Sequence, residues 1–285
     1  MNKDTKFSSD KTMCFGKKLF SLSKPMVMGI LNCTTDSFYD GGQYTSEEAI
    51  VRRAFEIIEQ GGDVIDIGAV SSKPGAELIP TDVEIERLVP IIKLLRHEFP
   101  NAILSVDTCW AKVAKAVADE GADIINDISG GQFDTEMFNT VAQLQLPYIL
   151  MHTKGLPSVM QTQTQYADIM QEMIMYFSEK LDKLYYLGVK DIIIDPGFGF
   201  AKTLEQNYTI MKHLKDFSVF KEPLLVGISR KSMIYNLLNS DAQKALNGTT
   251  VLNTYALMNG AKFIRVHDVK EAVETIKIIE QLNKH

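Results

Sequence analysis

The chain has 285 residues, 45% of them hydrophobic, which is enough for a large core, and no low-complexity segment separates domains. Its formal charge of −6 and pI near 5.5 argue against a nucleic-acid-binding surface, because no basic stripe stands out against the surplus of Asp and Glu. No apolar run approaches the ~18 residues of a membrane span, and the first residues contain no apolar stretch of secretory type. Three cysteines without paired or metal-ligand spacing fit a reducing compartment, so we expect a cytoplasmic protein that binds neither nucleic acid nor membrane.

Short apolar runs predict eight β-strands along the chain. The first 24 residues carry no such run, and we expect them to form an N-terminal extension that is partly disordered. Residues 25–285 then form a single domain. The expected strands are residues 27–31, 64–67, 103–106, 123–126, 148–151, 191–194, 224–227 and 263–266.

Longer stretches of helical periodicity lie between these strands, as at residues 46–60, 83–98, 111–120, 167–187 and 269–282. Alternating strands and helices indicate parallel strands joined by right-handed crossovers. An open doubly wound sheet of the dinucleotide-binding type would need G-x-G-x-x-G after the first strand, where this chain has Asn32-Cys33-Thr34 instead. We therefore expect an α/β fold of the closed (β/α)8 (TIM) barrel class.

Polar side chains follow every predicted strand. An Asp after one strand is often only a helix cap, but eight such ends are hard to explain by capping. In a closed barrel all these strand ends face one surface, where such enzymes carry their active sites. In chain order the residues are Asn32, Asp66, Asp107, Asn126 with Asp127, His152, Asp195, Ser229-Arg230-Lys231, and Arg265 with His267.

Two of these ends suggest specific ligands. The Asp195 carboxylate could accept two parallel hydrogen bonds from an amidine-like edge, such as that of a pterin or guanine, and the glycines that follow it permit close backbone approach. After the seventh strand, Arg230 and Lys231 precede a helix predicted to start near Ser232. Positive charge at a helix N-terminus is suited to an anion, and this is the common phosphate corner of such barrels.

Eight segments at the eight strand ends together resemble the dihydropteroate synthase family, the folate-pathway enzymes that sulfonamide drugs inhibit. They read MGILNCTTDSFYDGG, DIGAVSSKPGA, SVDT, INDISG, MHTKG, DPGFGFAKT, GISRKS and RVHDV, and they extend from about residue 26 to the end of the chain. The resemblance implies a (β/α)8 barrel that joins 6-hydroxymethyl-7,8-dihydropterin diphosphate to 4-aminobenzoate through a pterin cation, with Mg²⁺ as cofactor. It also implies small-molecule substrates and a homodimer formed through late barrel helices.

The resemblance assigns roles to individual residues. It implies Asp36, Asp107, Asp195 and Lys231 as catalytic residues, and Asp107, Asn126, Met151, Asp195, Lys231 and Arg265 as pterin ligands. Asn32, Ser72, Arg265 and His267 would hold the diphosphate, with Asn32 also the metal ligand. Thr35, Phe38, Pro74, Phe200, Ser229 and Ser232 would form the aminobenzoate pocket.

The chain departs from the family pattern in two loops. Cys33 and Thr35 stand where the family usually has Val and Pro, and Lys73 stands where it usually has Arg. Loss of the proline reduces pre-ordering of the first loop, and lysine lacks the planar fork of arginine. Two alternatives stay open: a barrel related to the methyltransferases that bind methyl-tetrahydrofolate, and a pterin-binding paralogue with impaired turnover. A metal-dependent hydrolase barrel is disfavoured, because no H-x-H pair ends the first strand.

Overall fold

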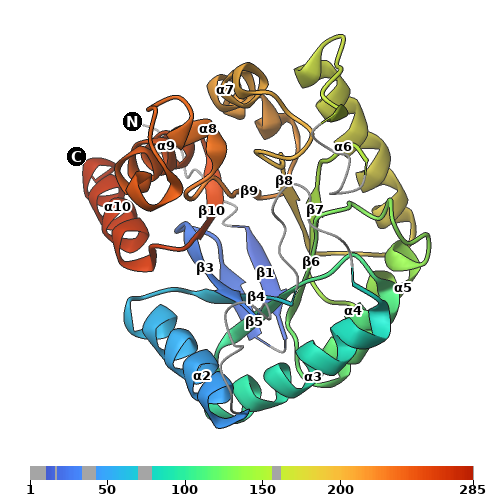
Figure 1. The fold of residues 1–285 in the computed structure, drawn as a ribbon. Helices are drawn as coiled ribbons and strands as arrows, with labels where there is room; N and C mark the ends of the chain where they lie inside the picture. Colours follow the sequence, from blue (N-terminus) through green and yellow to red (C-terminus); the bar gives the residue numbers. More distant parts are fainter. Residues whose placement is uncertain (1–10, 17, 34–42, 70–78, 156–161, 285) are drawn as a thin grey trace, which may run out of the picture.

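A closed barrel of eight parallel strands forms the centre of the molecule (Figure 1). The computed structural model describes residues 11–16, 18–33, 43–69, 79–155 and 162–284. Each strand pairs with its neighbours in the sequence, and the last pairs with the first. The strands are β3 (Met26–Asn32), β4 (Val64–Gly68), β5 (Ile103–Asp107), β6 (Ile124–Asp127), β7 (Tyr148–Met151), β8 (Ile192–Asp195), β9 (Leu224–Val226) and β10 (Ala261–Val266). All eight predicted strands and the closed barrel are confirmed.

Helices surround the barrel as an outer ring (Figure 1). They are α2 (Gln43–Glu59), α3 (Thr81–Glu98), α4 (Ala111–Asp119), α5 (Met137–Leu144), α6 (Ile169–Tyr186), α7 (Leu204–Lys212), α8 (Ser232–Tyr235), α9 (Leu246–Met258) and α10 (Val269–Leu282), with 3₁₀ turns η2 (Leu214–Val219) and η3 (Ala242–Lys244). The five predicted helices correspond to α2, α3, α4, α6 and α10, with ends that differ by a few residues. None of the helices in the described part of the chain combines the length and the hydrophobicity of a membrane span.

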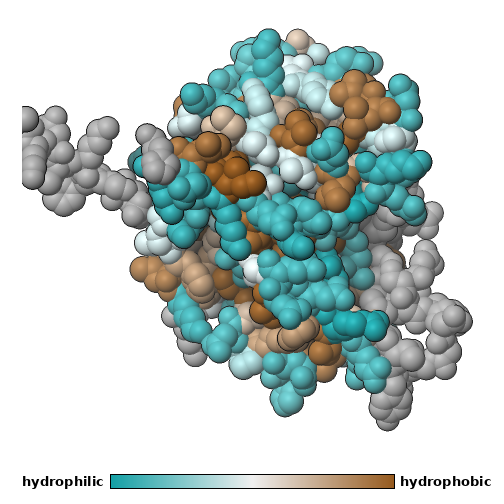
Figure 2. All heavy atoms as spheres, turned by 90° about the vertical axis from the view of Figure 1, so that its left-hand side faces the viewer, coloured by the Kyte–Doolittle hydropathy of each residue, from teal (hydrophilic) through white to brown (hydrophobic). Residues whose placement is uncertain are grey.

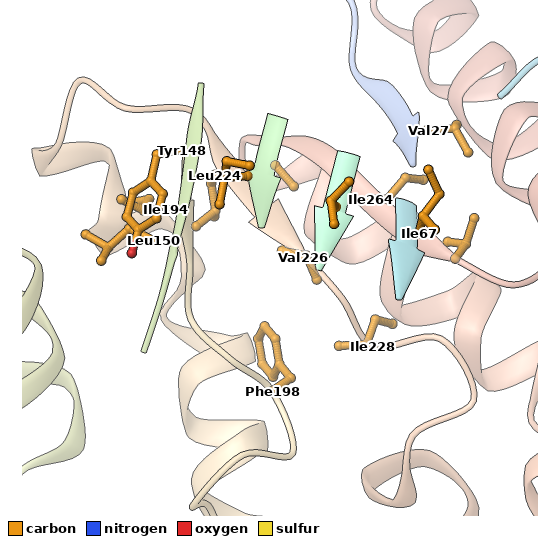
Figure 3. Packing of buried hydrophobic residues seen from close by; sticks show 14 of the residues in the cluster. Val27, Ile67, Tyr148, Leu150, Ile194, Phe198, Leu224, Val226, Ile228 and Ile264 are labelled. Atoms are coloured by element: carbon orange, nitrogen blue, oxygen red, sulfur yellow. The ribbon is translucent and has the colours of Figure 1, made fainter. Parts of the chain in front are cut away.

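The outward side chains of the strands pack against these helices. Because side chains alternate along a strand, every second residue faces the ring, as Figure 3 shows for Val27, Ile67, Leu150 and Ile264. These positions are almost entirely Val, Ile and Leu. Such a layer of buried aliphatic side chains contributes roughly 1.5–3 kcal/mol per residue to the free energy of unfolding.

The inward side chains fill the amino-terminal half of the barrel with a second apolar core. It is formed by Met26, Met28, Val64, Ile103, Ile124, Ile149, Ile193, Leu225 and Phe263. Three side chains from the N-terminal segment join it and close that end of the barrel, namely Met13, Phe15 and Leu22.

The segment that closes the barrel is an antiparallel hairpin of β1 (Thr12–Phe15) and β2 (Lys18–Ser21). The Cys14 amide donates to Asp191, just before β8, and Phe15 lies edge-on to Phe263, with ring centroids 6.4 Å apart. The sequence patterns predicted no element before residue 25. This hairpin leaves the carboxyl-terminal end of the strands, called the mouth below, as the place for a ligand.

Candidate active site

The floor of the mouth is a layer of inward side chains directly above the apolar core. Val64, Ile103, Ile124, Ile149, Ile193 and Phe263 all belong to that core. Two residues further along each strand the side chain faces inward again, one layer closer to the mouth. These positions are Asp66, Ser105, Asn126, Met151, Asp195 and Arg265, with Asp107 one layer above Ser105. The strand register therefore brings the predicted Asp107, Asn126, Met151, Asp195 and Arg265 together.

Asp66 and Arg265 are at the centre of this floor. Arg265 Nε donates to Asp66 Oδ2 at 2.6 Å, and its Nη2 lies 3.4 Å from Asp107 Oδ2. The Asp66 side chain is fully buried, whereas 16% of the Arg265 side chain is exposed. Asn126 Nδ2 lies 3.2 and 3.3 Å from the two Asp66 oxygens, and Ser105 donates to Oδ1 at 2.7 Å. Two carboxylates thus share one guanidinium.

The ionisation of the Asp107 carboxyl group is sensitive to charge in the mouth. Burial raises its pKa to about 7, while the Arg265 guanidinium opposes that rise and the Asp66 charge adds to it. A carboxyl with a pKa near neutrality gains charge when a cation forms beside it. Asp107 can therefore stabilise positive charge that develops on a ligand.

Asp195 and Lys231 form the opposite side of the floor. Burial raises the pKa of Asp195 and lowers that of Lys231 to about 8, and the attraction between the two groups opposes both shifts. Lys231 Nζ donates to the Phe198 carbonyl at 2.5 Å and lies 4.7 Å from the centroid of the Phe200 ring. Lys231 thus interacts with both the inward Asp195 carboxylate and the Phe200 ring.

The loop after β8 holds Phe200 in place. The Gly197 amide donates to Asp195 at 2.7 Å, and its φ of +68° favours glycine; a Cβ there would lie 2.1 Å from the His152 carbonyl oxygen. Lys202 is buried beneath the loop, donates to the carbonyls of Gly197 and Phe200 at 2.9 Å, and lies 3.1 Å from His152 Nδ1. Sequence reasoning gave Lys202 no role, although a lysine directly after a glycine-rich turn is a usable signal.

The loops after β9 and β10 are joined by side-chain contacts. Ser229 Oγ accepts from the His267 amide at 3.1 Å and lies 3.0 Å from its Nδ1. The structure corrects the prediction for Arg230, which was expected to supply charge for an anion. Its guanidinium instead donates to both Asp268 oxygens at 2.7 and 2.9 Å and to the carbonyls of Ala242 and Gln243. Arg230 therefore holds the loop after β9 against Asp268 and the 3₁₀ turn η3.

The helix expected near Ser232 does start there, but α8 comprises only four residues. A single turn has a smaller dipole than a full helix, so a ligand at Ser232 would depend mainly on hydrogen bonding to the half-buried side chain and adjacent amides. Lys231 is then the nearby positive charge of this corner.

The remaining predicted residues lie at the rim or outside the described ranges. Asn32 is exposed at the end of β3, across from Gly68 of β4, and His267 is exposed after β10. In the ranges that the structure describes, no three His, Cys, Asp or Glu side chains gather as a metal site. Five predicted residues fall outside these ranges: Thr35, Asp36, Phe38, Ser72 and Pro74.

Asp127, like Arg230, was expected at the mouth but does not face into it. It follows Asn126 and so faces outward, where its carboxylate accepts from the amides of Ser129 and Gly131 and from the Tyr148 hydroxyl. Asp66 and Ser105 are the opposite case, because they belong to the floor but were assigned no role from the sequence. The alternation of side chains along the strand distinguishes the two cases.

Comparisons with known proteins agree with this geometry. The family model described as pterin binding enzyme matches residues 28–267. The dihydropteroate synthase of Synechocystis is 42% identical, with 94% of this chain and 93% of that protein covered, and that of Escherichia coli K12 is 41% identical, with 91% and 92% covered.

Solved structures show the same likeness. The Yersinia pestis dihydropteroate synthase in complex with a sulfonamide drug has a TM-score of 0.90 and 38% identity, with 96% of this chain and all of that chain covered. The Xanthomonas albilineans enzyme with 4-aminobenzoic acid has a TM-score of 0.89 and 32% identity, with 96% and 99% covered. The chain belongs to the dihydropteroate synthase family of pterin-binding enzymes.

Proposed function

We infer that this protein condenses 6-hydroxymethyl-7,8-dihydropterin diphosphate with 4-aminobenzoate, giving 7,8-dihydropteroate and diphosphate. The observation that carries this proposal is the floor of the mouth, where Asp107, Asn126 and Asp195 converge beside Lys231 and Arg265. The pterin ring edge carries an amino group and a ring N–H, both donors, and carboxylate and amide oxygens are their natural acceptors.

The proposed pterin site uses the residues of the floor other than Asp66 and Ser105, which lie behind them. Asp107, Asn126 and Asp195 would accept from the ring, and the buried Met151 would contact its face. Lys231 Nζ, which donates to the Phe198 carbonyl in the loop after β8, would donate to the ring acceptors. Arg265, the partly exposed member of the cluster, would cover the outer side of the ring.

The diphosphate would lie toward the rim, against Arg265, His267, Asn32 and Ser72. Mg²⁺ usually keeps several waters and binds through one or two protein groups together with phosphate oxygens, so an exposed amide such as that of Asn32 suits it better than a carboxylate cage would. When bound there, the ion would neutralise charge on the leaving diphosphate.

The aminobenzoate would bind closer to the mouth. Phe200 would contact its ring, and Ser229, Ser232 and their neighbouring amides would take its carboxylate. Thr35, Phe38 and Pro74 would complete the pocket from the two loops that follow β3 and β4. The 4.7 Å distance from Lys231 to the Phe200 ring supports this place, since the lysine would then separate the two substrates.

The chemistry suited to this arrangement is departure of diphosphate before attack by the amine. The C–O bond at the pterin methylene breaks, with its electrons leaving on diphosphate, and the resulting cation is delocalised into the dihydropterin ring. The arylamine nitrogen then forms the new C–N bond and loses a proton. Asp107, Asp195 and Asp36 would stabilise charge that exists only in the transition state, where binding energy raises the rate.

A turnover assay tests the proposal directly. Purified protein is mixed with the pterin diphosphate, Mg²⁺ and 4-aminobenzoate, and release of diphosphate and formation of dihydropteroate are measured. Asp195→Asn should abolish pterin binding, because it replaces an acceptor with a donor at the ring N–H. Asp191→Asn is the matched control, since Asp191 lies just before the same strand and bonds the hairpin. Tight pterin binding without release would instead favour the impaired paralogue.

The proposal includes a homodimer. Helix α9 exposes Val251, Tyr255 and Met258 at helical spacing, with exposed fractions of 57, 40 and 67%, and Leu237 and Leu238 are exposed after α8. Figure 2 looks onto this side of the molecule and shows hydrophobic side chains at the surface among hydrophilic ones. A second copy of the chain is the proposed occupant of this face, because aligned apolar residues on one helix suit a self-complementary contact.

A cytoplasmic location completes the proposal. Cys14, Cys33 and Cys109 are all free thiols, which supports a reducing compartment.

A further inference from the structure

Asp66 is a buried carboxylate that organises two of the proposed pterin ligands at once. It is fully buried, and its two oxygens are approached by three different side chains. Oδ2 accepts from Arg265 Nε at 2.6 Å, Oδ1 accepts from Ser105 at 2.7 Å, and Asn126 Nδ2 lies between the two oxygens. Asp66 is 0% exposed, whereas Asn126 is 4% exposed and the Arg265 side chain 16%, so a ligand in the mouth meets these two partners first.

The contact with Asp66 fixes which way the Asn126 amide faces. A carboxylate paired with a guanidinium only accepts hydrogen bonds, so the amide must turn its NH₂ group toward Asp66. The Asn126 Oδ1 atom is then on the opposite side of the amide. As a result Asn126 presents an acceptor to the mouth, next to the carboxylate of Asp107, which is its register partner across β5 and β6.

The same contact fixes the plane of the Arg265 guanidinium. Its Nε is bound at 2.6 Å by Asp66 and its Nη2 lies 3.4 Å from Asp107, so two carboxylates define the orientation of a planar group. Asp66 provides the shorter contact. Without it, Arg265 would retain only the longer one.

We propose that Asp66 is a positioning residue that sets the hydrogen-bond pattern of the pterin pocket, making it accept donors from the ligand. The inference rests on the proposed function, because it concerns recognition of the same substrate. Asp66 acts through Asn126 and Arg265 and does not touch the ligand. A ring edge with adjacent donors fits this pattern, and one with adjacent acceptors does not.

Asp66→Asn tests the proposal with almost no change in shape. An amide at position 66 can donate to Asn126 Oδ1, which allows the Asn126 amide to turn and present its NH₂ group to the ligand. We expect affinity for 6-hydroxymethyl-7,8-dihydropterin diphosphate, measured by calorimetry, to fall about tenfold or more. The KM for that substrate should rise in parallel, while the KM for 4-aminobenzoate should change by less than about threefold.

The double variant Asp66→Asn/Asn126→Asp provides the decisive comparison. A carboxylate at position 126 accepts from the new amide and still offers an oxygen to the ligand, so the acceptor pattern returns. Asn126→Asp alone places two carboxylates side by side, which is unfavourable. Pterin affinity of the double variant should therefore exceed that of both single variants.

Ser105→Ala is the matched control, since it removes one contact to Asp66 and leaves Asn126 and Arg265 bound to it. Its pterin affinity should stay within about threefold of the wild type. Thermal unfolding of every variant is followed by circular dichroism, so that affinity is compared among folded proteins.

Three results would overturn the inference: unchanged pterin affinity in Asp66→Asn, no recovery in the double variant, or a loss in Ser105→Ala as large as that in Asp66→Asn. The proposed function is judged separately on the wild type. A wild-type protein that neither binds the pterin diphosphate nor releases diphosphate refutes the function, whereas a wild type that does both, with unresponsive variants, refutes only the role of Asp66.

Discussion

Some single side chains around the mouth lower the stability of the folded protein when they are ionised. This effect can be measured apart from activity, and Glu84 is the clearest case. This residue lies in the first turn of α3 with only 3% of its surface exposed. Burial raises its pKa to about 7, and a hydrogen bond with Thr108 opposes the rise. Its charge also contributes to the raised pKa of Asp107. Glu84 is therefore costly to ionise in the folded protein.

Glu84→Gln should stabilise the protein at alkaline pH. The folded-state pKa lies above the unfolded value of about 4.5, so the contribution of Glu84 to stability is fully present below that value and is lost as pH rises through 7. The variant should gain about 1–3 kcal/mol in the free energy of unfolding at pH 8 and much less at pH 5. Urea unfolding at both pH values measures this. Glu86→Gln, at an exposed position on the same helix, is the control; the same gain at both pH values would contradict the prediction.

The predicted positions of site residues agree with the structure where the strand end itself decided them. Asp107 and Asp195 end their strands and face inward, so the apolar run and its final carboxylate sufficed to find them. Asp127 was read together with Asn126, which does enter the mouth, but the next residue of a strand faces the other way. Arg230 was read together with Lys231, but it lies in the loop after β9 and pairs with Asp268. Asp66 was recognised as a strand end from the sequence. That it faces inward follows only from Val64, two residues earlier on the same strand, which belongs to the inward core.

At the scale of elements, the β1–β2 hairpin is the part that closes the amino-terminal end of the barrel. Phe15→Ala should destabilise the protein by about 3–5 kcal/mol, because Phe15 is 2% exposed and packs against Phe20 and Phe263. Chemical unfolding measures the change. Leu19→Ala in the same hairpin is the control, since Leu19 is 70% exposed and should cost little. Equal losses would show that the hairpin does not pack as described.

The barrel strands were predictable because both faces of each are buried, which produces continuous Val, Ile and Leu runs. The hairpin strands are four residues long, and in β2 only Phe20 is not exposed, so no such run marks them. Helix α9 was also absent from the predicted set, because Gly248 and several threonines in its sequence disfavour a helix in isolation. Tertiary packing decides these elements.

For the whole molecule, the exposed face of α9 makes association testable. Met258→Glu should convert the proposed dimer to a monomer, because it places a charge in an apolar contact. Size-exclusion chromatography with light scattering gives the mass directly. Met175→Glu on α6 is a closely matched control, as Met175 is 64% exposed and Met258 67%. A wild type that is already monomeric, or a dimer that survives Met258→Glu, would contradict this assignment.

The closed barrel itself was inferred from the count of strands and the missing dinucleotide fingerprint. Sequence alone does not impose closure, since it depends on the pairing of β10 with β3, two segments at opposite ends of the domain. The predicted contributions of Thr35, Asp36, Phe38, Ser72 and Pro74 lie outside the described residues and remain predictions.

The hairpin plugs the amino-terminal end of the barrel, so the pocket is closed at its lower end. In the described part of the chain the hairpin closes that end, so a molecule bound at the floor would enter, and a product would leave, through the mouth. A heterocycle held at the floor by Asp107 and Asp195 has to enter before any arylamine that rests above it. With the substrates placed as proposed, the product would have to leave through the mouth before the next pterin could enter, and the pterin would bind before the aminobenzoate.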